Sequence, residues 1–165
     1  SRKTEILMNA FLVVSSVNAL VLLCLSVLAG KRVPVSLSES YYLMDKRGWL
    51  FQLLLAGTAL TLLPVWICCS ECRHEWMSFL SCASLLFVAA APCFRLELEG
   101  KVHYTAAAVC CVCAVLWQVS EELWDVTLWF AFLGGMLSLQ WKDKWCWWLE
   151  VAVTGSVYCN LYRLV

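Results

Sequence analysis

The first long apolar run reads ILMNAFLVVSSVNALVLLCLSVLA, from Ile6 to Ala29, and it contains no charged residue. A helix needs about 17–25 mostly apolar residues to cross the hydrocarbon core of a bilayer. The apolar core of a signal peptide is shorter, at about 7–15 residues. The run therefore predicts a membrane-spanning helix that the mature protein retains.

Five further apolar runs follow along the chain. Together with the first they predict six spans, at Ile6–Ala29, Trp49–Cys69, Trp76–Phe94, His103–Ser120, Leu123–Leu139 and Trp145–Leu164. The runs are continuously apolar rather than alternating, which predicts helices and not the strands of a barrel. The fifth run is the shortest and closely follows the fourth, so a five-span bundle with one of these two segments in the membrane interface stays open. In both cases residues 1–165 are predicted to form a single all-α, polytopic transmembrane bundle.

The composition supports a membrane protein. Hydrophobic residues make up 62% of the chain and charged residues 15%, against about 45–50% and about 25% in ordinary globular domains. A soluble domain of this length could not bury so much apolar surface in one core. The formal net charge is zero and no basic run exceeds two residues, which argues against nucleic acid as a partner. The expected partners are membrane lipids, together with a second copy of the chain or the helices of another membrane protein.

Tryptophans mark the ends of the apolar runs. Indole rings prefer the headgroup region of a membrane, where the ring is half buried and its N–H stays hydrated. We therefore expect belts of tryptophan at the two membrane surfaces. The side chains concerned are Trp49, Trp66, Trp76, Trp117, Trp124, Trp141, Trp145, Trp147 and Trp148, whereas Trp129 lies within a run.

The basic residues predict an orientation. In a six-span bundle, eight Lys and Arg residues fall on one side of the membrane and four on the other. Because cytoplasmic loops carry the excess of Lys and Arg, the side with eight is expected in the cytoplasm. Both termini are then expected on the non-cytoplasmic side.

The first connection is the long one, and residues 33–42 within it read VPVSLSESYY. We refer to residues 33–42 as the cap. Loops carry function more often than the elements they join, so the cap is a candidate ligand contact or lid over the bundle. The alternative is an amphipathic interfacial stretch whose tyrosines lie among the headgroups. The candidate side chains are Ser36, Ser38, Glu39, Tyr41 and Tyr42.

A polar stripe is predicted on the last span. Glu150, Thr154 and Tyr158 are spaced at i, i+4 and i+8 and therefore share one helix face. A carboxylate in the middle of a bilayer costs about 2.5–3.5 kcal/mol on insertion scales, so such residues usually face the bundle interior. This favours an inward-facing polar site. The alternative is a carboxylate near the interface that pairs with Lys142 or Lys144.

His103 opens the fourth run and is a further candidate site residue. One hypothesis makes it the titrating partner of a carboxylate, namely Glu97, Glu99 or Glu150. The other interpretation is a histidine that forms hydrogen bonds at the water boundary.

A metal site is the weakest of the candidates. Cys69, Cys72 and His74 have the cysteine spacing of a zinc knuckle, but a structural zinc site needs four closed ligands and the distant second pair is missing. An incidental cluster of interfacial thiols is the preferred interpretation. The other cysteines are expected to act as small apolar side chains between helices. No metal and no other cofactor is predicted.

Three short stretches stand out, namely PVSLSESYY at residues 34–42, HYTA at residues 103–106 and WLE at residues 148–150. With them the chain resembles uncharacterised six-helix bacterial membrane proteins that are distantly similar to the DRAM/Frag-like family. The resemblance implies a multi-pass protein of a bacterial inner membrane, without established chemistry. It also implies that the polar cap and the intramembrane acid matter most.

The sequence is compatible with three classes of function. The preferred hypothesis is a binding or scaffold protein of the bilayer, with a polar pocket for a lipid-like ligand or for partner helices. Glu150, His103 and Tyr158 are its expected polar contacts. One alternative is a small oligomeric channel or transporter. The other is a membrane-embedded hydrolase in which Ser36 or Ser38 acts with His103, but the chain has no Gly-x-Ser-x-Gly elbow and no His-Glu-x-x-His motif.

Overall fold

The computed structural model describes residues 2–90 and 98–165, and within this part of the chain all regular structure is helical. Six long helices account for most of it, and a short helix and two 3-10 turns lie in the connections. Their bounds are α1 Arg2–Gly30, α2 Glu39–Leu43, η1 Asp45–Arg47, α3 Gly48–Cys68, α4 Glu75–Ala90, α5 Leu98–Ser120, α6 Trp124–Gln140, η3 Lys142–Lys144 and α7 Trp145–Leu164.

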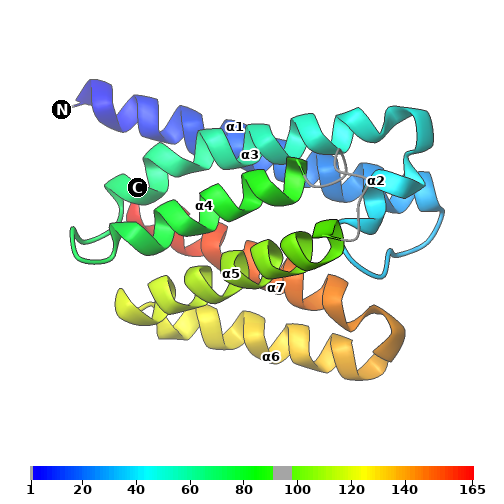
Figure 1. Ribbon diagram of the computed structural model, residues 1–165. Coiled ribbons are helices and arrows are strands. Elements are labelled where there is room, and N and C mark those ends of the chain that lie inside the picture. The colour runs from blue at the N-terminus through cyan, green and yellow to red at the C-terminus, as the bar shows by residue number, and fades with distance from the viewer. Residues whose placement is uncertain (1, 91–97) are drawn as a thin grey trace.

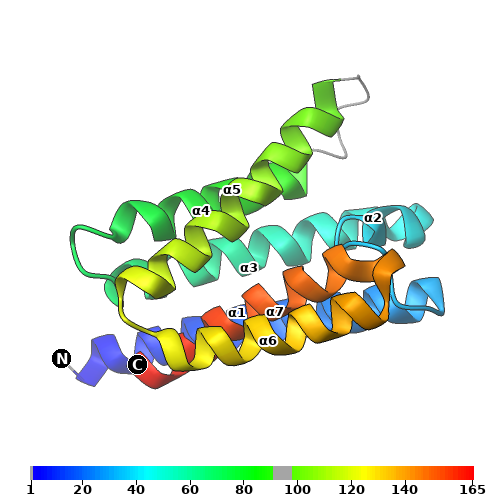
Figure 2. The same cartoon turned by 90° about the horizontal axis from the view of Figure 1, so that it is seen from below.

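The long helices run up and down, each antiparallel to the next, because short connections leave no other arrangement (Figure 1). Helices α1, α3, α4 and α5 pack in sequence, and α7 contacts both α1 and α5 while α6 lies on its outer side (Figure 2). The N-terminal half of α5 diverges from α6 and α7 (Figure 2). Both chain termini lie at one end of the bundle, and α2 lies at the other.

The six long helices coincide with the six predicted apolar runs, so the all-α bundle is confirmed. The end of the third run, beyond Ala90, lies outside the described residues. By length and composition, three of the described helical segments suffice to cross a membrane, at Arg2–Gly30, Asp45–Cys68 and Lys101–Ser120. Helix α4 is apolar but shorter. Helix α6 has only 17 residues, and α7 contains Glu150 and three tryptophans in its first two turns.

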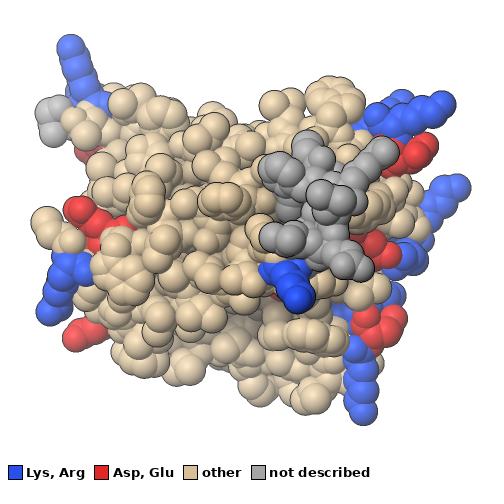
Figure 3. All heavy atoms as spheres, viewed as in Figure 1, with Lys and Arg blue, Asp and Glu red and all other residues tan. Residues whose placement is uncertain are grey.

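Charged side chains gather at the two ends of the bundle. Figure 3 shows Lys, Arg, Asp and Glu at both ends of the visible face, with an uncharged band between them that is interrupted beside the grey residues. The sequence explains the band, because α3 contains no charged residue and α1 contains none after Glu5. Glu150, in the second turn of α7, is the described carboxylate that lies furthest inside a helix.

The prediction of two tryptophan belts is correct only in part. Trp49, Trp76, Trp124, Trp141 and Trp145 are exposed, as expected of interfacial residues. In contrast, Trp66, Trp117 and Trp147 are buried in the protein. The rings of Trp66 and Trp117 meet edge to face with centroids 5.4 Å apart, and the Trp117 indole N–H donates to the Ser70 hydroxyl at 2.8 Å. The protein thus supplies an acceptor for the Trp117 indole in place of the headgroups, whereas the buried Trp66 N–H has no hydrogen-bond partner among the described residues.

A buried polar network joins the last three helices. The side-chain carbonyl of Gln118 on α5 accepts hydrogen bonds from the Asn160 amide of α7 at 2.9 Å and from the Thr127 hydroxyl of α6 at 3.0 Å. Gln118 and Asn160 are completely buried. Such bonds hold helices together where apolar surroundings offer no water, and each contributes roughly 0.6–2 kcal/mol.

Glycines bring α6 and α7 into close contact. A Cβ atom built on Gly134 would lie 2.6 Å from the Cβ of Ala152 and 3.4 Å from the carbonyl oxygen of Trp148. A Cβ on the neighbouring Gly135 would meet no atom within 4 Å. Small residues at an interface allow this approach of two backbones.

We expect Gly134→Ala to separate α6 from α7 and to lower the free energy of unfolding by about 1–3 kcal/mol, the usual cost of overpacking. Gly135→Ala is the matched control, because it adds the same methyl group to open space. It should leave stability unchanged or raise it by about 0.5–1 kcal/mol through helix propensity. Denaturant unfolding of the detergent-solubilised protein, followed by tryptophan fluorescence, measures both. Equal effects of the two substitutions would contradict the close packing.

Candidate functional site

The cap is folded around Glu39. Its carboxylate accepts a hydrogen bond from the backbone N–H of Val35 at 2.6 Å and forms an ion pair with Arg32, just before the cap. Partial burial raises the pKa of Glu39, but the Val35 N–H and the Arg32 guanidinium favour the ionised form more strongly. The net result is a pKa below its ordinary value. An ionised Glu39 thus holds both ends of the turn that leads into α2.

Two hydrogen bonds attach the cap to α7. The N–H of Trp147 donates to the carbonyl oxygen of Val35 at 3.1 Å, and the N–H of Leu37 donates to Oε2 of Glu150 at 2.6 Å. Trp147 lies in the first turn of α7, where N–H groups have no acceptor within the helix. The cap therefore supplies an acceptor to the helix, and the helix returns one to the cap through Glu150.

A small cavity lies beneath this contact. Its volume is about 50 Å³, and its lining is mostly aliphatic. The two hydroxyls in the lining already donate to backbone carbonyls of their own helices, Thr58 to Leu54 and Thr154 to Glu150. Ordered water needs two to four polar partners, so this lining favours an apolar group. The lining residues are Leu37 of the cap, Ala19, Leu22 and Leu23 of α1, Leu55 and Thr58 of α3, Leu85 of α4, and Thr154 of α7.

The other cap residues point in different directions. The hydroxyls of Ser36 and Ser38 lie 3.1 Å apart. Tyr41 packs edge to face on Phe51 of α3, with ring centroids 6.2 Å apart. Tyr42 is 72% exposed, which is the behaviour expected of an interfacial tyrosine. The cap thus combines residues 35–37, which are hydrogen-bonded to α7, with the exposed Tyr42.

Tyr158 and His103 do not join Glu150 in one pocket. The hydroxyl of Tyr158 lies 2.6 Å from that of Ser15, two turns deeper along α7. His103 belongs to the second turn of α5, in the half of that helix that swings away from α7 (Figure 2). Its ring packs against that of Tyr104, with centroids 5.7 Å apart. The side chains of Glu97 and Glu99, the other partners considered for His103, lie outside the described residues.

The partners of Glu150 differ from those that the sequence suggests. Its contacts are the backbone N–H of Leu37 and the thiol of Cys146, and the described ion pairs place Lys144 beside Asp143 instead. A backbone donor leaves no trace in a sequence pattern. Cys146, one turn before Glu150 on the same face, is the signal that could have been found.

The candidate metal ligands are not gathered. His74 Nδ1 lies 3.0 Å from a carboxylate oxygen of Glu121, Cys69 packs against the core and Cys72 is exposed. Among the described residues, no group of three or more His, Cys, Asp or Glu side chains is arranged to hold a metal ion. The ten cysteines of this part of the chain are free thiols.

The lowered pKa of Glu39 predicts a pH dependence of stability. A carboxylate whose pKa is lower in the folded state stabilises the protein fully above its unfolded value, and this contribution is lost as the pH falls through the folded value. At pH 7 we expect Glu39→Gln to be less stable than the unmodified chain by about 1 kcal/mol, after allowance for solvent screening.

Melting curves between pH 7 and pH 3 provide the measurement. The difference between Glu39→Gln and the unmodified chain should shrink as the pH falls below 4.5, the ordinary pKa of Glu39. Glu5→Gln, which removes an exposed carboxylate from α1, is the control and should show no comparable dependence. A difference that stays constant over this range would refute the role of an ionised Glu39.

Comparison of the chain with known protein families, curated proteins and solved structures finds no match. The resemblance to the DRAM/Frag-like family therefore stays a prediction. The features that bear on function are the cap, Glu150, and the cavity lined by Leu37, whose N–H Glu150 accepts.

Proposed function

We propose that this chain is an integral membrane binding protein whose six long helices all cross the bilayer. Its ligand site is the space beneath the cap, beside Glu150, and its ligand is a lipid-like or small amphiphilic molecule. The observation that carries the proposal is the attachment of the cap to Glu150 over an apolar cavity at one end of the bundle. An amphiphile fits this arrangement, because its polar group would contact Glu150 and its apolar part would enter the cavity.

The crossing of all six helices is supported by the distribution of charge and by the termini. A charge-poor band separates two charged ends (Figure 3), as the solvent on either side of a bilayer requires. Both termini lie at the same end (Figure 1), which an even number of crossings produces. Exposed apolar side chains such as Leu60, Phe87 and Leu128 cover the outer surface and would face lipid.

The size of the cavity implies that the cap moves. A volume of about 50 Å³ is far below the roughly 300–1,000 Å³ of ordinary ligand pockets. A ligand can therefore enter only if the cap separates from α7. The attachment consists of two hydrogen bonds to backbone N–H groups, and one of them depends on the Glu150 carboxylate, which becomes available to a polar ligand group when the cap lifts.

The topology can be tested with reporter fusions in a bacterial host. We expect a C-terminal alkaline phosphatase to be active and a C-terminal green fluorescent protein to be dark, because both termini lie on the non-cytoplasmic side. Fusions placed after Lys144 should show the opposite pair of results. Termini on opposite sides would indicate five spans and contradict the proposal.

The ligand site can be tested by Glu150→Gln. The amide keeps the shape but loses the charge, so we expect the amount of co-purified amphiphile, measured by mass spectrometry, to fall roughly tenfold, as for loss of a charged hydrogen bond. Asp143→Asn is the matched control, because it removes an exposed carboxylate at the same end of α7 and should leave retention unchanged.

The remaining outcomes separate the classes of function. If Glu150→Gln changes neither ligand retention nor stability, Glu150 is not the polar contact of the ligand and the proposed site is wrong. Ion flux in liposomes that disappears in the same variant would favour a channel instead. Turnover that disappears in Ser36→Ala or Ser38→Ala would favour a hydrolase.

A further inference from the structure

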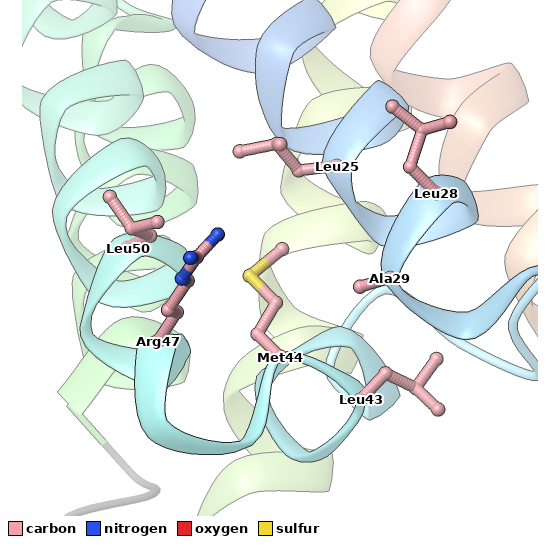
Figure 4. Close-up of a pocket in the computed structure, with 7 residues that line it drawn as sticks. All are labelled: Leu25, Leu28, Ala29, Leu43, Met44, Arg47 and Leu50. Atoms are coloured by element: carbon pink, nitrogen blue, oxygen red, sulfur yellow. The ribbon is translucent and has the colours of Figure 1, made fainter.

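A second and larger cleft lies outside the cap, between the end of α1 and the start of α3. Its volume is about 430 Å³, which falls within the roughly 300–1,000 Å³ range of ligand pockets. Its walls are aliphatic apart from one side chain, Arg47. The lining residues are Leu25, Leu28 and Ala29 of α1, Leu43, Met44, Arg47 and Leu50 (Figure 4).

The guanidinium of Arg47 points into this cleft rather than away from the protein (Figure 4). Among the ion pairs of the described residues, the neighbouring acid Glu39 is paired with Arg32, and none includes Arg47. Asp45 is the nearest acid in sequence, and it is exposed. The cleft thus offers five guanidinium donors that the described residues leave without an acidic partner.

The shape of the cleft results from the packing of the two helices. Deeper in the bundle, a Cβ atom on Gly57 of α3 would lie 3.0 Å from the Asn18 amide of α1, so the helices are close there. At the end of α1, a Cβ on Gly30 would lie 2.8 Å from Leu43, so α2 closes the cleft on that side. The mostly apolar cleft lies between these two contacts and opens to the outer surface, where Leu28 is 71% exposed.

We propose that this cleft binds an anionic membrane phospholipid, with its phosphate on Arg47 and the upper part of one acyl chain along Leu25, Leu28 and Leu50. The charge of the surroundings complements such a ligand, because residues 31–47 contain four basic and two acidic side chains. Guanidinium binds phosphate through two parallel hydrogen bonds. The level of the cleft fits as well, because it lies at a charged end of the bundle, where headgroups meet the hydrocarbon layer.

The inference rests on the membrane placement proposed above but not on the Glu150 site. The two sites have no lining residue in common, and they recognise different chemistry. The cap site offers an acceptor carboxylate under a lid, whereas the cleft offers a cation in an open groove. Substitutions at Arg47 and at Glu150 therefore report on the two proposals separately.

The test is a lipid titration of the purified protein in detergent, followed by native mass spectrometry. Phosphatidylglycerol and phosphatidylcholine with the same acyl chains are compared. We expect phosphatidylglycerol to bind more tightly and Arg47→Gln to weaken its binding roughly tenfold, the effect of losing one charged hydrogen-bonded contact. Lys46→Gln is the matched control, because it removes a neighbouring exposed cation that does not line the cleft, and it should change binding by less than about twofold.

A second variant tests the apolar half of the site. Ala29→Phe fills the cleft without altering any charge, and it should weaken phosphatidylglycerol binding while the melting temperature stays unchanged. Equal losses in Lys46→Gln and Arg47→Gln would overturn the proposal in favour of diffuse surface charge. Displacement of the lipid by millimolar inorganic phosphate, or insensitivity to Ala29→Phe, would overturn the part played by the acyl chain.

Discussion

Polar groups that this bundle removes from water need partners inside the protein, because an apolar surrounding supplies none. This constraint explains the long-range hydrogen bonds of the structure. Leu37 N–H reaches Glu150, Trp117 reaches Ser70, and Asn160 reaches Gln118. Each bond joins segments that are distant in sequence, so satisfying the polar groups and fixing the positions of the helices are the same event.

The same constraint organises the end of the bundle that carries both proposed sites. Glu39 is ionised within the cap, Glu150 receives a backbone N–H, and Arg47 is left without an acidic partner among the described residues. The carboxylates of Glu39 and Glu150 both accept backbone N–H groups of the cap and so hold it over a small cavity. Arg47 lines the outer cleft and is the group that the proposed phospholipid would contact. The proposed closed site, which needs a conformational change, thus lies at the same end of the bundle as a proposed open site that needs none.

The predictive value of the sequence is greatest for the helices and smaller for the site. Six apolar runs match six long helices because the length and polarity of a helix are local properties. Trp66 and Trp117 illustrate the limit. Their position at the ends of apolar runs predicts an interface, but each ring is buried against the other, since helix ends that meet in the bundle are interior and not surface. The separation of His103 from α7 has a similar origin, because the N-terminal half of α5 diverges from α7 only through packing that no local pattern records.

The sequence by itself determined that the chain forms apolar helices with charged ends, that a polar cap follows the first helix, and that Glu150 lies in an otherwise apolar segment. These are consequences of composition and spacing along one element. Only the tertiary structure decided that Glu150 holds the cap through a backbone N–H, that Tyr158 pairs with Ser15, and that Arg47 lies in a cleft between α1 and α3. The reason is physical, since backbone donors are identical at every residue, and the space between two helices depends on both of their surfaces at once.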